Sequence, residues 1–166
     1  MDSMRSLIKQ LGKILGQKIW TLAIAESCTG GMLGDMITGL PGCSKFFLGG
    51  VIAYSNQAKS TLLNVSTESL EKYGAVSPEV ALAMARGIRD IMGSSVGAAV
   101  TGIAGPGGGG KEKPVGLIYI SVLTPELEVV KRFSLAGSRR EIKTQAAETA
   151  IKLLIRVLQE TISGAE

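Results

Sequence analysis

Strand-like apolar runs alternate with helix-like segments along most of this chain, and this alternation restricts the possible folds more than any other feature of the sequence. The apolar runs cover residues 21–25, 46–54 and 96–101. Helix-like patterns follow the first two runs, at residues 32–38 and from about residue 56. Strands that alternate with helices favour parallel pairing, because each helix carries the chain back across the sheet.

The helix with the clearest boundaries is predicted over residues 78–92. Ser77 is a favourable N-cap, and Pro78 then takes the first helical position, where its missing N–H costs nothing. Glu79 lies in the first turn, and Gly93 stands where the helix should stop.

The C-terminal part of the chain departs from simple alternation. Residues 117–123 and 129–133 are two strand-like runs around a short turn, which predicts a hairpin. The sequence Ser138-Arg139-Arg140-Glu141 fits a capping box that opens a long final helix. Together with an amphipathic helix around residues 7–15, this pattern predicts an α/β fold. We expect a single-domain three-layer sandwich over residues 1–166, with a mixed, mostly parallel sheet.

Composition excludes several classes of protein. With 45% hydrophobic residues the chain has enough apolar surface for a sizeable core. Its 18 Lys+Arg and 14 Asp+Glu give a net charge of +4, and the basic residues are scattered, which argues against nucleic acid and suits a small anionic ligand. No signal peptide is visible, and no run approaches the ~18 apolar residues of a membrane span. We expect a cytoplasmic protein whose two cysteines are reduced.

The chain contains no histidine, and this absence limits its chemistry. A Ser-His-Asp or Cys-His mechanism is excluded, and the commonest zinc ligand is missing. Any catalytic base must therefore be Lys, Tyr, Asp or Glu. We expect neither a metal nor a cofactor.

The loop after the first apolar run carries a candidate nucleophile. It reads Glu26-Ser27-Cys28-Thr29-Gly30-Gly31 and leads directly into a helix. Exposed N–H groups at a glycine-rich helix start suit a phosphate or a developing oxyanion. The alternative is a capped turn, in which Ser27 and Thr29 only satisfy backbone donors.

Residues 102–110 are too rich in glycine for a helix or a strand and are predicted to form a loop. They match both the dinucleotide-binding and the P-loop patterns, but each pattern needs a helix directly afterwards. Here Pro114 leads into a strand, and Glu112 stands where a P-loop requires Ser or Thr, so we reject both interpretations. A ligand-binding loop and a flexible surface turn remain.

A phenol and an amine follow the second apolar run, as Tyr54 and Lys59. Because they follow the end of a strand, as Ser27 does, they are expected near the same edge of the sheet. Ligands of α/β proteins bind at that edge, beyond the carboxyl ends of the strands. Alone, they are more typical of a strand end and a solvated helix lysine than of a functional pair. Two S-x-x-K matches, beginning at Ser6 and Ser69, lie in amphipathic stretches and are chance matches.

Five segments occur together in a specific order. They lie at residues 25–31, 54–56 with Lys59, 74–77, 101–106 and 113–116. In this order they resemble the C-terminal domain of the competence/damage-inducible CinA proteins, a family that includes stand-alone nicotinamide-nucleotide amidohydrolases. The resemblance runs from about residue 14 to about residue 158. Because the chain begins at a methionine just before the first helix, we expect the stand-alone form.

The resemblance implies hydrolysis of nicotinamide mononucleotide to nicotinate mononucleotide and ammonia. Ser27 would attack the carboxamide carbon, with Lys59 as the base and Tyr54 relaying or orienting the proton. Whether Lys59 or Tyr54 takes the proton directly stays open. Backbone N–H groups near three residues would hold the oxyanion: Thr29, Gly30 and Gly31. Six further residues would contact the nucleotide: Thr101, Gly102, Gly105, Pro106, Gly107 and Arg139.

The sequence departs from the family pattern twice. Ser138 stands where the family usually has Asp, and Ser can take over the N-cap role. Lys143 stands where the family often has Arg, which weakens a bidentate phosphate contact there but leaves Arg139 intact.

Two other functions remain open at this stage. One is a module that binds a nucleotide or docks on a partner without chemistry, and the other is an amidase for a different carboxamide. A small-molecule nucleotide is the expected partner, with no nucleic acid and no membrane. The sequence does not fix the oligomeric state, for which we expect a homo-oligomer, a dimer or higher.

Overall fold

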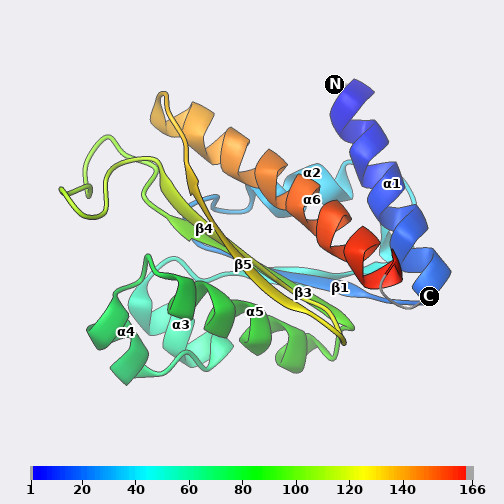
Figure 1. The fold of residues 1–166 in the computed structure, drawn as a ribbon, viewed down its shortest axis with the longest axis horizontal. Helices are drawn as coiled ribbons and strands as arrows, with labels where there is room; N and C mark the ends of the chain where they lie inside the picture. The colour runs from blue at the N-terminus through cyan, green and yellow to red at the C-terminus, as the bar shows by residue number, and fades with distance from the viewer. Residues whose placement is uncertain (1, 164–166) are drawn as a thin grey trace.

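The computed structural model describes residues 2–163 and contains one five-stranded sheet with the strand order β2-β1-β3-β4-β5 (Figure 1). The pairs β1/β2 and β1/β3 are parallel, whereas β3/β4 and β4/β5 are antiparallel. Four strands therefore run in one direction and only β4 opposes them, as the sequence predicts. The strands are β1 (Leu22–Glu26), β2 (Phe47–Ile52), β3 (Val96–Gly102), β4 (Leu117–Leu123) and β5 (Glu128–Ser134).

Helices cover both faces of the sheet and complete the three-layer sandwich (Figure 1). One layer contains α1 (Asp2–Lys18), α2 (Met32–Thr38) and α6 (Arg139–Ser163). The other contains α3 (Asn56–Leu63), α4 (Thr67–Tyr73) and α5 (Pro78–Met92). A separate cluster of buried apolar side chains fills the space on each side of the sheet. No helix in the described part of the chain combines the length and apolar character needed to cross a bilayer.

The helix boundaries follow the predicted local signals. Ser77 caps α5 by accepting the N–H of Val80 at 3.3 Å, and Gly93 ends the helix in the left-handed conformation. At the start of α6 the backbone N–H of Ser138 donates to the Glu141 carboxylate at 2.7 Å, which is one half of the predicted capping box. The α5 prediction is confirmed at both ends.

The edge strand β2 shows the close backbone approach that the pair Gly49-Gly50 indicates. A Cβ on Gly50 would lie 2.5 Å from Cγ1 of Ile24, so a larger residue would push β2 away from β1. The register also shifts between Leu22 and Ala23, where β2 contains one extra residue.

Two elements were not predicted from the sequence. Helix α4 was not separated from the helix that begins at residue 56, and the short 3-10 helix η1 (Cys43–Lys45) was not distinguished from the turn before it. Asn64 ends α3 in the left-handed conformation, and Ser66 then caps α4. The break between the two helices depends on these two short polar side chains, which are weaker signals than Gly or Pro.

Candidate active site

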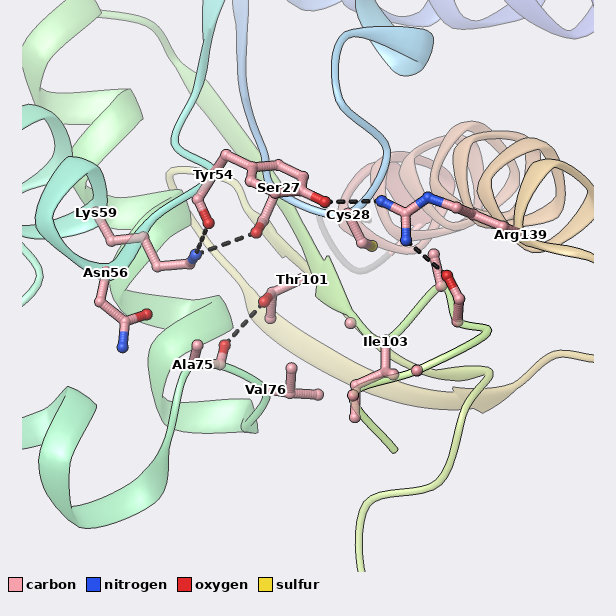
Figure 2. Close-up of a pocket in the computed structure, with 15 residues that line it drawn as sticks. Ser27, Cys28, Tyr54, Asn56, Lys59, Ala75, Val76, Thr101, Ile103 and Arg139 are labelled. Carbon is pink, nitrogen blue, oxygen red and sulfur yellow. Dashed lines mark hydrogen bonds between the residues drawn. The ribbon is translucent and has the colours of Figure 1, made fainter. Parts of the chain in front are cut away.

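Ser27 and Lys59 meet at the carboxyl end of the parallel part of the sheet. Ser27 directly follows β1, and Lys59 lies in the first turn of α3, just beyond β2. The two residues are 32 positions apart in the chain, yet Nζ of Lys59 lies 3.1 Å from Oγ of Ser27 (Figure 2). This distance is within the range for transfer of a proton between a nucleophile and its base.

Lys59 is buried, and no carboxylate of the described residues forms a hydrogen bond or an ion pair with it. Its side chain is 1% exposed, and its second hydrogen bond joins Nζ to the backbone carbonyl of Tyr54 at 3.1 Å. Burial lowers the pKa of the Lys59 amine from its ordinary value of 10.5. The geometry therefore favours the neutral amine that a base requires.

Cys28 is next to Ser27 but is poorly suited to act as a nucleophile. It is 5% exposed, and burial raises the pKa of its thiol from 9.0 to about 12, with the negative charge of Glu26 contributing in the same direction. A thiol in this environment stays protonated and weakly nucleophilic. Ser27 is therefore the better candidate.

Tyr54 contacts the site in a way that the sequence does not predict. Its phenol oxygen accepts a hydrogen bond from Arg139 at 2.8 Å, while its backbone carbonyl accepts one from Lys59 (Figure 2). The phenol has no hydrogen bond to Ser27 or Lys59 in the described residues. Lys59 is therefore held by the main-chain carbonyl of Tyr54, and the role of the phenol in relaying or orienting the proton stays a prediction.

The loop after Ser27 also differs from the expected oxyanion site. The N–H of Gly31 donates to the Glu26 carboxylate at 3.1 Å, and the N–H of Gly30 donates to the Ser27 carbonyl at 3.1 Å. Both groups already have acceptors in this structure, and the predicted role of Gly30 and Gly31 as oxyanion donors would require them to exchange these bonds. In residues 2–163 the N–H groups of Cys28 and Thr29 donate to no carbonyl or carboxylate. The hydroxyl of Thr29 is buried and has no hydrogen-bond partner among the described residues.

Ser27 and Lys59 open into a pocket of about 260 Å³, which we call the Ser27 pocket. Most of its wall comes from the loops that follow β1, β2 and β3 and from the segment between α4 and α5 (Figure 2). Among the described residues that line it, the only charged side chains are Lys59 and Arg139. The lining residues are Ser27, Cys28, Tyr54, Asn56, Lys59, Ala75, Val76, Thr101, Gly102, Ile103, Ala104, Gly105, Gly107, Gly108 and Arg139.

Five of the six predicted nucleotide-contact residues line the Ser27 pocket. Gly102, Gly105 and Gly107 line the pocket, whereas Pro106 is not among its lining residues. Thr101 lines it as well, and its hydroxyl donates to the carbonyl of Ala75 at 2.8 Å, which leaves its oxygen as an acceptor; its contact with the nucleotide stays a prediction. Gly102 is required by the packing of β3 on β4, because a Cβ there would lie 2.6 Å from the carbonyl oxygen of Leu117.

Arg139 lies at the mouth of the Ser27 pocket and joins two of its walls. One terminal nitrogen donates to the carbonyl of Gly105 at 2.6 Å, and the other donates to the phenol of Tyr54. A guanidinium has five N–H donors, so three remain for a ligand. Asn56, Ala75, Val76, Ile103, Ala104 and Gly108 were not singled out from the sequence as contact residues, because they reach the pocket only through the tertiary fold.

Comparison with known protein families shows which family the chain belongs to. The model of the CinA C-terminal domain matches residues 4–158, which is most of the sequence. The chain belongs to the CinA C-terminal domain family. The family resemblance inferred from the five ordered segments is confirmed.

Curated CinA relatives are considerably longer than this chain. A putative competence-damage inducible protein of Moorella thermoacetica is 51% identical over 148 residues, which cover 89% of this chain and 36% of that protein. A CinA-like protein of Desulfotalea psychrophila is 47% identical over 161 residues, which cover 97% of this chain and 38% of that protein. The chain thus spans less than half the length of these two relatives.

Solved structures of the CinA superfamily share the whole fold. A superfamily protein from Klebsiella pneumoniae has a TM-score of 0.90 at 29% identity, covering 95% of this chain and 98% of that one. The competence/damage inducible protein CihA from Agrobacterium tumefaciens has a TM-score of 0.87 at 35% identity, covering 94% of this chain and 95% of that one. These matches confirm the predicted fold class.

The two departures from the CinA pattern lie at the start of α6. Ser138 takes part in the capping box, as predicted. The ammonium of Lys143 lies near Gly30, 3.5 Å from the position that a Cβ on that glycine would occupy. Lys143 does not line the Ser27 pocket, so Arg139 is the better candidate for a phosphate contact.

Proposed function

We propose that this chain is an amidohydrolase that converts nicotinamide mononucleotide to nicotinate mononucleotide and ammonia. The proposal rests on one observation above all: a serine hydroxyl lies 3.1 Å from a buried lysine amine inside a pocket that no carboxylate lines. A serine and a neutral lysine can perform acyl transfer without histidine. Membership in the CinA C-terminal domain family, which includes stand-alone nicotinamide-nucleotide amidohydrolases, supports the substrate class.

The reaction runs in two halves. The neutral Lys59 amine takes the proton from Ser27, and Oγ bonds to the carboxamide carbon to give a tetrahedral oxyanion. Lys59 then returns a proton to the departing nitrogen, the C–N bond breaks, and ammonia leaves behind an ester on Ser27. Lys59 next takes a proton from water, and the resulting hydroxide attacks this ester. As the C–O bond to Ser27 breaks, Lys59 returns that proton to Oγ of Ser27, and the acid leaves as its carboxylate, with its own proton passing to the solvent.

We assign stabilisation of the oxyanion to the backbone N–H groups of Cys28 and Thr29, which would donate hydrogen bonds to it. Both belong to the turn that carries Ser27, and neither donates to a carbonyl or carboxylate in the described structure. A donor on the residue after a nucleophile lies close to the carbon under attack. This assignment replaces the donors at Gly30 and Gly31 that the sequence predicts.

The electrostatics of the Ser27 pocket favour an anionic substrate. Arg139 lies at its mouth with three free N–H donors, and none of the lining residues is acidic. A phosphate bound to Arg139 would place the rest of a mononucleotide inside the pocket, toward Ser27. This arrangement supports a phosphorylated substrate over nicotinamide itself.

An ammonia-release screen tests the proposed function. The purified protein is incubated separately with nicotinamide, its riboside, its mononucleotide and the dinucleotide, and ammonia is measured in each. Turnover should be fastest with the mononucleotide. Binding without ammonia release from any of them would instead support a non-catalytic module. Rapid release from an unrelated carboxamide, with little from the mononucleotide, would indicate a different amidase.

Replacing Arg139 with alanine should weaken recognition of the phosphate. We expect KM for the mononucleotide to rise at least about tenfold, the usual scale for a lost charged hydrogen bond, and KM for the riboside to change much less. Steady-state kinetics on both substrates measure the difference. Because Arg139 also holds Gly105 and Tyr54, some loss common to both substrates is expected.

Arg140→Ala is the matched control for this variant. Arg140 is the next residue of α6, is exposed and does not line the Ser27 pocket, so its loss changes the net charge equally without touching the site. KM for the mononucleotide should then stay within about twofold of wild type. Equal increases in KM for the two substrates in Arg139→Ala would show that Arg139 does not recognise the phosphate.

A further inference from the structure

Glu26 is a buried carboxylate beside the proposed nucleophile, and the proposed chemistry gives it no role. Its side chain is 2% exposed. Oε2 accepts the N–H groups of Gly31 and Leu33, each at 3.1 Å, and Oε1 accepts that of Gly34 at 2.9 Å. These donors are the last residue of the Ser27 loop and two residues of the first turn of α2.

These three contacts argue against Glu26 as a base. Both carboxylate oxygens accept backbone N–H groups, and no hydrogen bond joins them to Ser27 or Lys59 in the described residues. A general base must lie within hydrogen-bond reach of the proton that it takes, and the hydrogen bonds of this carboxylate go to the backbone of residues 31–34 instead. Glu26 therefore contributes through its position.

The same contacts constrain the loop that carries Ser27. Residue 26 ends β1, so its backbone is fixed by the sheet, and its carboxylate fixes Gly31 and the first turn of α2 five to eight residues later. The loop between residues 26 and 31 is thus closed at both ends by one side chain. Within this closed loop lie Ser27 and the N–H groups of Cys28 and Thr29.

We propose that Glu26 is a positioning residue, which holds the Ser27 loop so that Oγ and the N–H groups of Cys28 and Thr29 point together at the carboxamide. The proposal builds on the proposed function. A displacement of catalytic groups by about 1 Å can cost about a hundredfold in rate, so a loosened loop should affect turnover more than substrate binding.

Glu26→Gln tests this role. The amide has nearly the same shape but only one acceptor oxygen, so its NH2 group would face at least one of the three backbone donors. We expect kcat for the mononucleotide to fall at least about tenfold while KM stays within about threefold. The rate at which a fluorophosphonate labels Ser27 should fall in parallel, because that reaction needs the same attack by Oγ, with fluoride leaving.

Glu26→Asp is the second variant, in case the glutamine variant does not fold. It keeps the negative charge but is shorter by one methylene, so it cannot reach all three donors. It should also lose at least about tenfold in kcat. If either folded variant, checked by circular dichroism, retains kcat and labelling rate within twofold of wild type, the positioning role is wrong.

Two controls separate positioning from a general loss of stability. Asp35→Asn makes the same carboxylate-to-amide change at an exposed residue of α2 that is not among the three donors, and it should retain kcat. Leu158→Ala removes a fully buried side chain about 28 Å along α6 from Arg139, so it should lower Tm and retain kcat. A loss of kcat in Leu158→Ala equal to that in Glu26→Gln would overturn the proposal.

Failure of the proposed function would give a different experimental result from failure of the positioning role. A wild-type protein that releases no ammonia from any nicotinamide compound would refute that function. The fluorophosphonate labelling of Ser27 in wild type and in the Glu26 variants would still decide whether Glu26 positions the nucleophile.

Discussion

Ser27→Ala should reduce kcat for nicotinamide mononucleotide by at least about a thousandfold, because removal of a covalent nucleophile leaves only the weak residual catalysis of binding and oxyanion stabilisation. KM should change little, since Ser27 is one of fifteen residues that line the pocket. Ammonia release under saturating substrate measures the loss. Mass spectrometry of wild type, quenched during turnover, should show the acyl ester on Ser27 and no adduct in the variant.

Ser60→Ala is the matched control for the nucleophile. Ser60 follows Lys59 on α3 and donates to the carbonyl of Val65 at 2.9 Å, outside the Ser27 pocket. The kcat of Ser60→Ala should stay within about twofold of wild type, because only one structural hydrogen bond is lost. A Ser27→Ala variant with turnover close to wild type would refute the serine mechanism and return attention to water or Cys28.

Lys59→Met should reduce kcat by at least about a hundredfold, the usual scale for a general base. Methionine keeps an unbranched apolar stem in a site that is 1% exposed, so folding should be preserved while the amine is lost. The double variant with Ser27→Ala should be scarcely slower than Ser27→Ala alone, because nucleophile and base act as one unit. Losses that multiply would mean that Lys59 acts independently of Ser27.

The pH dependence of wild-type turnover follows from the environment of Lys59. Burial lowers the pKa of its amine from 10.5, so the neutral base forms at a lower pH than for a lysine in water. The rate should rise with pH through this lowered pKa and then level off. A plot of kcat against pH should lose this rise in Lys59→Met.

The pH dependence of the free energy of unfolding reports the pKa of Lys59 without an activity assay. Because the folded pKa of Lys59 lies below 10.5, the unfolded chain binds more protons between the two values, and wild-type stability should rise with pH in that window. Lys59→Met lacks this rise. Its free energy of unfolding relative to wild type should therefore decrease as the pH approaches 10.5, by about 1.4 kcal/mol for each unit of lowered pKa. A constant difference across this range would show that Lys59 titrates normally.

Local sequence signals determined most of the fold. The cap at Ser77, the first-turn Pro78 and the terminal Gly93 fix the ends of α5 through backbone hydrogen bonds and dihedral preferences that depend on adjacent residues alone. The order of strands and helices likewise indicated a mixed, mostly parallel sheet, and the structure has it. Ser27 was a candidate from its loop, whereas Lys59 and Arg139 were singled out by the resemblance to the CinA family.

The tertiary structure decided which of these candidates meet and what each one contacts. Ser27 and Lys59 come together because β1 and β2 pair in parallel and end at the same edge, although 32 positions separate them in the chain. The phenol of Tyr54 reaches Arg139, 85 positions away, and Glu26 takes the N–H of Gly31. Side-chain direction and hydrogen-bond competition depend on sheet register and on groups distant in sequence, which no local pattern encodes. The sequence by itself therefore determined the elements and the candidate chemistry, and only the packed fold assigned the partners.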